Sequence, residues 1–124
     1  MLRHVQQDST SLVSSFRYAA AGLAHLLRTQ RNARIELAVG ALAVALGAWL
    51  GLSGPEWAVL SLTIALVVIL EGLNTALELT VDLASPERSP IARAAKDVSA
   101  GMVLVAALGS IAVGAGIFLP HLVK

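Results

Sequence analysis

The residues best suited to chemistry in this chain come directly after a long apolar run. Fourteen uncharged residues, WAVLSLTIALVVIL, precede the stretch EGLNTALELTVD, which begins at residue 71. At 100° per residue, four polar side chains of this stretch fall within an arc of about 80° on one helix face: Glu71, Asn74, Glu78 and Asp82. Three clustered carboxylates suit a hydrated Mg²⁺ ion and a ligand that carries phosphate, because Mg²⁺ prefers oxygen ligands.

The depth of these acids in the apolar run makes a functional role the favoured explanation. Counting from Trp57, Glu71 lies about 21 Å along the helix and Glu78 about 10 Å further. An ionised acid at membrane depth costs about 2.5–3.5 kcal/mol on insertion scales, so such residues face a cavity or protein and usually serve a site. The structural alternative is a salt bridge to Arg34 or Lys96.

A second polar motif, AKD, precedes the last apolar run. Lys96 is suited to neutralise phosphate charge as a point cation, and Asp97 to hold that lysine in place. Capping of the following helix by Asp97 explains the pair equally well. The chain has no Walker A sequence, no GxGxxG and no HExxH, so nucleotide and metal sites of the soluble type find no support.

These residues are carried by elements that point to an all-α membrane protein. The chain has 124 residues, of which 56% are hydrophobic and only 14% charged, far from the balance of a soluble domain. We expect one membrane domain over 1–124, with transmembrane helices at 35–55, 57–80 and 97–119. Mixed polarity over 9–34 indicates an amphipathic helix at the membrane surface, or alternatively a solvated helix that packs on a partner domain.

The basic residues predict the orientation in the membrane. Eight of the nine Lys and Arg residues precede the first span or lie between the second and third. By the positive-inside rule, these segments are cytoplasmic, which puts the N-terminus inside and the C-terminus outside the inner membrane. Trp49 and Trp57 flank the outer loop, where aromatic residues are common. We expect no cleavable signal, no disulfide and no nucleic-acid partner.

Small residues at four-residue spacing predict close helix packing. They are Ala43, Gly47 and Gly51 in the first span, and Ala106, Ser110 and Gly114 in the third. Such spacing lets helix backbones approach closely in lipid. Because three spans form a thin bundle, we expect self-association, although glycine is enriched in transmembrane helices generally.

Several motifs together resemble the small bacterial integral-membrane diacylglycerol kinases, a family that includes undecaprenol kinases. They are RNARIEL at the entry to the first span, EGLNTALELTVDL, SPE and AKDVSAG. The resemblance implies a homotrimer with sites at the cytoplasmic membrane surface, each using residues from neighbouring subunits. It also implies transfer of the γ-phosphate of ATP, with Mg²⁺, to the hydroxyl group of diacylglycerol or undecaprenol.

The same resemblance implies roles for individual residues. Glu71 matches the general base that removes the proton of the lipid hydroxyl, and apolar surroundings make a carboxylate a better base. Asn74 and Asp82 match the supporting polar face. Glu78 and Gln30 match the positions that hold the metal. The positions matching the ATP site as a whole are Tyr18, Gln30, Glu78, Glu87, Lys96 and Asp97, with Tyr18 beside the nucleotide and Glu87 at adenine.

The chain departs from the family pattern at several positions. Gln30 stands where the family usually has a metal-binding Glu, and a carboxamide is a weaker Mg²⁺ ligand than a carboxylate. Arg88 and Ser89 replace the loop segment that often carries a histidine. Glu36 stands where many relatives have His, and we assign it no role. Three lone histidines are expected at the interface or in solvent: His4, His25 and His121.

Two other functions compete with a lipid kinase. In a small oligomeric transporter, Glu71 would be the titrating carrier residue, but such a residue is better placed near the midplane than toward the cytoplasm. A catalytically silent assembly subunit is compatible with Gln30. The clustered acids and the Lys96–Asp97 pair favour the kinase.

Overall fold

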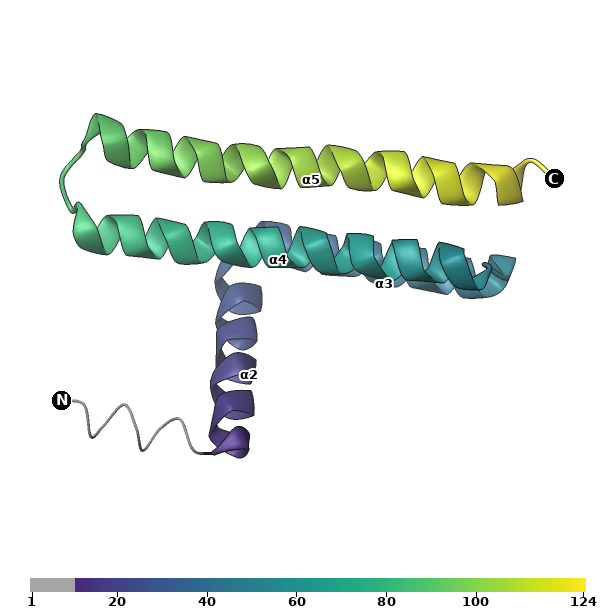
Figure 1. Cartoon of the computed structure of the whole chain (residues 1–124), viewed down its shortest axis with the longest axis horizontal. Helices are drawn as coiled ribbons and strands as arrows, with labels where there is room; N and C mark the ends of the chain where they lie inside the picture. The colour runs from purple at the N-terminus through teal and green to yellow at the C-terminus, as the bar shows by residue number, and fades with distance from the viewer. Residues whose placement is uncertain (1–10) are drawn as a thin grey trace. The chain divides into compact units, whose positions relative to one another are not determined.

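The computed structural model describes residues 11–124, and all regular elements in that range are helices (Figure 1). They are α2 (Leu12–Thr29), α3 (Arg31–Leu50), α4 (Gly54–Ala84) and α5 (Pro90–Leu122). The last three are long and apolar enough to cross a membrane. This confirms the predicted all-α class with three candidate spans. The chain divides into two compact units, the first ending at Arg31 and the second running from Asn32 to Lys124.

Helix α2 begins after an N-cap and ends earlier than the sequence indicates. The Ser11 hydroxyl accepts a hydrogen bond from the Ser14 N–H, which satisfies one of the free donors of the first turn. At the other end, Gln30 has an extended backbone (φ −112°, ψ 111°). The predicted continuous helix over 9–34 is therefore wrong beyond Thr29, because the extended Gln30 separates two helices. Residues 9 and 10, like His4, lie outside the described residues.

Glycines set the packing of α3 against α4. A Cβ at Gly40 would lie 3.1 Å from the Ile64 side chain, and one at Gly47 would lie 2.7 Å from Leu52 and 3.0 Å from Trp57. Only glycine therefore fits at Gly47 without displacing its neighbours. In both contacts, Gly40 with Ile64 and Gly47 with Trp57, the two residue numbers add up to the same value. A residue further along α3 therefore meets a residue earlier in α4, so the helices run antiparallel in a fixed register.

The connection between α3 and α4 is a tight turn. Helix α3 ends at Leu50, five residues before the end of the predicted first span. Gly51 has φ +73°, a left-handed conformation that glycine adopts without strain. The Ser53 hydroxyl then accepts from the Glu56 N–H, and the Glu56 carboxylate accepts from the Ser53 N–H at 3.0 Å. This reciprocal capping box starts α4.

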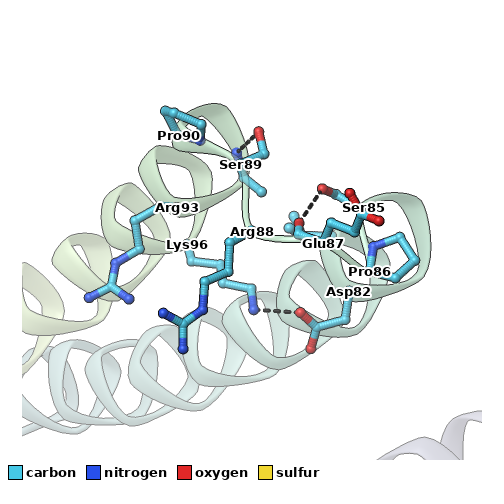
Figure 2. A pocket seen from close by; sticks show the side chains of 11 residues that line it. Asp82, Ser85, Pro86, Glu87, Arg88, Ser89, Pro90, Arg93 and Lys96 are labelled. Carbon is cyan, nitrogen blue, oxygen red and sulfur yellow. Dashed lines mark hydrogen bonds and ion pairs between the residues drawn. The ribbon is translucent and has the colours of Figure 1, made fainter.

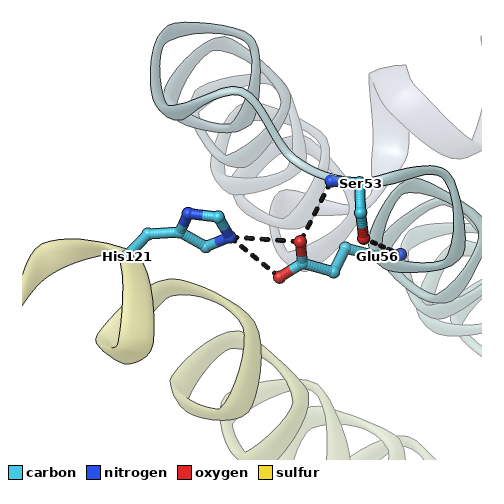
Figure 3. A network of polar contacts seen from close by, with 3 residues as sticks. All are labelled: Ser53, Glu56 and His121. Atoms are coloured by element: carbon cyan, nitrogen blue, oxygen red, sulfur yellow. Dashed lines mark hydrogen bonds and ion pairs between the residues drawn. The ribbon is translucent and has the colours of Figure 1, made fainter. Parts of the chain in front are cut away.

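A hydrogen-bonded pair of side chains, Glu56 and His121, joins the start of α4 to the end of α5 (Figure 3). The Nε2 atom of His121 lies 2.9 Å from one oxygen of Glu56 and 3.1 Å from the other. Only 16% of the His121 side chain is exposed. The prediction that His121 is a lone histidine is therefore wrong, because it contacts an acid 65 positions earlier in the chain. Its largely buried side chain also excludes full solvent exposure, whereas its location at the membrane interface stays a prediction.

Helices α4 and α5 lie side by side and run antiparallel (Figure 1). Where the start of α4 meets the end of α5, Leu52, Leu60 and Ile117 form a small buried cluster. At the opposite end, residues 85–89 form a short loop, and the Ser89 hydroxyl caps α5 by accepting from the Ala92 N–H. The loop thus places the ends of the two helices next to each other.

Candidate active site

The predicted polar face of α4 is organised around one deeply buried carboxylate. Only 2% of Glu71 is exposed. Its Oε2 atom is buried and accepts no hydrogen bond from any described residue. The nearby Thr75 hydroxyl donates to the backbone carbonyl of Glu71 at 3.0 Å, so it leaves the carboxylate unpaired. Buried polar groups are nearly always paired, so an unpaired one marks a position kept for something other than packing.

Asn74 and Glu78 continue the polar face, about one and two turns after Glu71. The Asn74 side-chain amide donates a weak hydrogen bond of 3.4 Å to Glu78 Oε1. The Asn74 Oδ1 atom is buried and has no donor among the described residues. Glu78 is half-buried, so its carboxylate is reachable while Glu71 is enclosed.

Asp82 and Lys96 form an ion pair that connects α4 to α5. The lysine side chain is 36% exposed and the aspartate side chain 64% exposed. The structural alternative therefore applies to Asp82, whose carboxylate fixes the position of the lysine ammonium group. It also brings Lys96 to the polar face of α4, as a phosphate-binding role requires.

Asp97 has a different partner from the one predicted. Its carboxylate lies 3.3 Å from Arg93 Nε, one turn earlier on α5, so the prediction that it holds Lys96 is wrong. The capping alternative is also wrong, because α5 begins at Pro90 with Ser89 as its N-cap. The helix starts at the proline of the second SP dipeptide, which leaves Asp97 two turns inside it.

A pocket of about 560 Å³ lies where α4, the loop and α5 meet (Figure 2). Three basic side chains line it, and Figure 2 shows the guanidinium groups of Arg88 and Arg93 on the same side of the loop as Lys96. Asp82 and Glu87 also line the pocket. Planar guanidinium groups and an ammonium group are the usual recognition elements for phosphate, so this pocket can accommodate a polyphosphate.

Tyr18 and Gln30 belong to the first unit. Tyr18 lies on α2 with an exposed side chain. Gln30 is the C-cap of α2, and its backbone N–H donates to the Leu26 carbonyl. The Gln30 amide group donates to the Thr29 hydroxyl at 3.4 Å, and its side-chain oxygen is an acceptor that a metal ion can use.

Sequence reasoning missed Glu36, an acid on α3 that experiences the negative charge of Glu71. Its Oε2 atom is also buried without a donor among the described residues. A signal was available, because Glu36 is the only acidic residue of α3 and an acid inside an apolar span marks a site. Among residues 11–124, no three His, Cys, Asp or Glu side chains gather as a metal site.

Comparisons with known proteins agree with these motifs. Residues 17–118 match the sequence profile described as prokaryotic diacylglycerol kinase. The chain is 43% identical to a diacylglycerol kinase of Synechocystis sp., over 98% of this chain and 70% of that protein. It is 42% identical to an undecaprenol kinase of Bacillus subtilis, over 87% of this chain and 88% of that protein. A diacylglycerol kinase of Haemophilus influenzae is 30% identical, over 78% and 82% of the two chains.

Proposed function

The chain belongs to the prokaryotic diacylglycerol kinase family and is a lipid kinase, and we propose that it transfers the γ-phosphate of ATP to a lipid hydroxyl group at the cytoplasmic membrane interface. The observation that carries this proposal is the unpaired, buried carboxylate of Glu71. An alcohol becomes a nucleophile when a positioned base takes its proton. Glu71 can act as this base, because its buried carboxylate oxygen accepts no hydrogen bond from the described residues.

The proposed reaction uses one proton and one phosphoryl group. Glu71 accepts the hydroxyl proton while the lipid oxygen forms a bond to the γ-phosphorus of ATP. The bond between that phosphorus and the bridging oxygen of the β-phosphate breaks, and ADP leaves. Phosphoryl transfer otherwise depends mainly on positioning and on neutralisation of charge.

The loop pocket supplies positive charge for the nucleotide in this proposal. Lys96, fixed by Asp82, neutralises charge on the phosphates. Arg88 lines the same pocket with an exposed side chain and forms no ion pair with a described residue, so its guanidinium is free to bind phosphate. The family resemblance adds Glu87 at adenine, Asp97 near the ribose and Tyr18 beside the nucleotide.

The donor atoms on α4 fit Mg²⁺. Glu78 presents a reachable carboxylate, and the Asn74 carbonyl oxygen next to it lacks a donor. Mg²⁺ takes oxygen ligands, and it is commonly held by one or two carboxylates together with waters and substrate phosphates, so a site with few acids suits it. Glu78 would hold the ion, and the resemblance assigns Gln30 to the same metal. When bound, the ion would neutralise phosphate charge.

The proposal includes a homotrimer in the inner membrane with the N-terminus in the cytoplasm. Large apolar side chains are exposed along all three spans of the isolated chain, among them Leu42, Leu62, Leu66, Leu104 and Ile111. Lipid or neighbouring subunits cover such surfaces in a membrane. Basic residues at both segments expected in the cytoplasm support the orientation.

The test is ATP consumption by the purified protein in liposomes. Diacylglycerol and undecaprenol are presented in separate preparations, because relatives of both names match the chain, and a triacylglycerol serves as a control without a hydroxyl group. We expect ATP consumption and a phosphorylated lipid with at least one alcohol and none with the control. ATP consumption that is the same with all three lipids, or absent with all, would refute the proposal.

A further inference from the structure

Three buried oxygen atoms of the second unit have no hydrogen-bond donor among residues 11–124. They are Glu36 Oε2, Glu71 Oε2 and Asn74 Oδ1. All three are acceptors, so the missing group is a donor. Leaving such acceptors unpaired costs about 1–3 kcal/mol each, and more when the group is charged. A ligand that brings a donor to this place would therefore be stabilised by them.

The register of α3 and α4 brings the two carboxylates toward each other. The contacts of Gly40 with Ile64 and of Gly47 with Trp57 fix that register. One heptad further it places Ala33 opposite Glu71, and each of these residues is only 2% exposed. Glu36 lies one turn further into α3 and interacts electrostatically with Glu71.

The charged residues near this pair lie on α3 and α4, and on α3 Arg34 is two residues from Glu36. On α4, the nearest further charge is Glu78, which acts electrostatically on Glu71. Helix α5 carries no charged residue between Asp97 and its C-terminal histidine. The part of α5 that lies along the middle of α4 therefore supplies neither a cation nor another acid.

Glu36 also lies at the end of an apolar cavity of about 340 Å³ between α3, α4 and α5. That volume falls in the range of small-molecule sites. Two hydroxyl groups line the cavity, but each donates to a carbonyl of its own helix: Thr63 to Val59 and Ser110 to Ala107, both at 2.7 Å. Glu36 is thus the one ionisable group of the cavity, with the apolar space extending from it toward Phe118.

We propose that this cavity holds the hydrocarbon chain of the acceptor lipid. The lipid hydroxyl group then lies between the carboxylates of Glu36 and Glu71, which are the acceptors for its hydrogen bond. The inference rests on the proposed function and assigns a second carboxylate to the same substrate. Its chemistry fits both ends of a lipid alcohol, because the cavity is apolar and Glu36, which lines it, offers a buried oxygen without a donor among the described residues. Glu36 then directs the hydroxyl toward the base.

A matched pair of glycine variants tests the cavity. A Cβ added at Gly114, which lines the cavity, or at Gly109, which does not, meets no atom within 4 Å. Gly114→Leu fills the cavity, and Gly109→Leu adds the same side chain elsewhere on α5. We expect Gly114→Leu to raise the KM for the lipid roughly tenfold, the effect of two excluded methylene groups. The KM for ATP should not change, and Gly109→Leu should match the parent.

Glu36→Gln tests the polar end of the site. It should raise the lipid KM severalfold and leave the ATP KM unchanged, because the amide keeps the size of the side chain but loses its charge. A structural defect would instead reduce kcat without separating the two substrates. Equal changes in both KM values, or none, would overturn the role of Glu36.

A binding measurement makes the inference independent of turnover. A long-chain primary alcohol that carries a photoreactive diazirine in its chain is added to the reconstituted protein, and the crosslinked residues are mapped. We expect crosslinks to cavity-lining residues in the parent and in Gly109→Leu, and their loss in Gly114→Leu. Identical crosslinks in all three proteins would refute the inference.

The outcomes separate this inference from the proposed function. Crosslinks in the cavity of a protein that phosphorylates no lipid would refute the kinase proposal alone. An active kinase whose lipid KM is unaffected by Gly114→Leu would refute the cavity assignment alone. If that variant changes the oligomeric state and leaves the lipid KM intact, the cavity receives a second copy of the chain, which also overturns the inference.

Discussion

Replacing Glu71 by Gln should separate activity from stability. The carboxylate has no hydrogen-bond donor among the described residues and only 2% of the residue is exposed. Its charge therefore contributes no ion pair or hydrogen bond that the substitution would remove, and a buried charge without a partner is itself destabilising. We expect Glu71→Gln to fold into the same oligomer, with a free energy of unfolding equal to that of the parent or higher.

The same substitution should greatly reduce the rate of lipid phosphorylation. Loss of a positioned base typically reduces the rate about 10²–10⁴-fold, which corresponds to about 3–5 kcal/mol of activation free energy. The assay is initial-rate lipid phosphorylation in liposomes at saturating ATP and lipid, combined with a denaturant titration of the same preparations.

Thr75→Val is the matched control for this experiment. Thr75 is also buried on α4, one turn from Glu71, and its hydroxyl donates only to a carbonyl of its own helix. The variant should keep a near-parental rate and lose about 1 kcal/mol of unfolding free energy at most. If Glu71→Gln turns over at the parental rate, or if it is inactive only because it no longer assembles, the assignment of Glu71 as the base is wrong.

Three further predictions concern the metal, the orientation and the outer end of the bundle. In a Mg²⁺ titration of lipid phosphorylation at fixed ATP, Gln30→Glu should lower the concentration needed for half-maximal rate, and Glu78→Gln should raise it; an unchanged midpoint in both would place the metal elsewhere. Because the chain has no cysteine, Gly54→Cys should react with a membrane-impermeant thiol reagent on intact cells and Arg88→Cys should not, whereas labelling of both would contradict the orientation. His121→Ala removes the hydrogen bond to Glu56 at the start of α4, so it should lower the free energy of unfolding without changing the phosphorylation rate, and equal unfolding midpoints would show that the pair is not stabilising.

The sequence predicts features that depend on local composition and periodicity. Three apolar runs are enough to identify the candidate spans, and helical spacing is enough to place Glu71 and Glu78 on one face. The helix break at Gln30 has no such signal, because neither glycine nor proline occurs there. The Ser53–Glu56 capping box was readable from the segment SGPE, although the sequence interpretation did not use it.

Contacts between distant residues were beyond that kind of reasoning. His121 pairs with an acid 65 positions away, and Lys96 with one 14 positions away. Both partners depend on the register of α4 against α5, which arises from packing along the whole helix pair. Glu36 itself could be recognised as an acid in an apolar span, but its relation to Glu71 could not, since that relation follows from glycine contacts between α3 and α4.

The two pairs of polar side chains that join α4 and α5, Glu56 with His121 and Asp82 with Lys96, bear on where the chemistry occurs in the membrane. Glu56 and Asp82 are separated by 26 residues on a continuous helix, or about 39 Å at 1.5 Å per residue. That distance exceeds the hydrocarbon thickness of about 30 Å, so both charged pairs can lie outside the hydrocarbon on opposite sides.

If the hydrocarbon begins just after Glu56, it covers about 20 residues of α4 and ends near residue 76. Glu71 then lies about 8 Å inside the boundary, whereas Glu78 and the Asp82–Lys96 pair lie outside it. A nucleotide bound at the loop pocket would keep its charged phosphates in the aqueous interface, and a lipid hydroxyl would reach Glu71 from the hydrocarbon side. The segment of α4 between Glu71 and Asp82, about 16 Å long, thus crosses the boundary between the hydrocarbon and water. The phosphoryl group would be transferred at this boundary, so the nucleotide would stay in the aqueous interface and the lipid in the membrane.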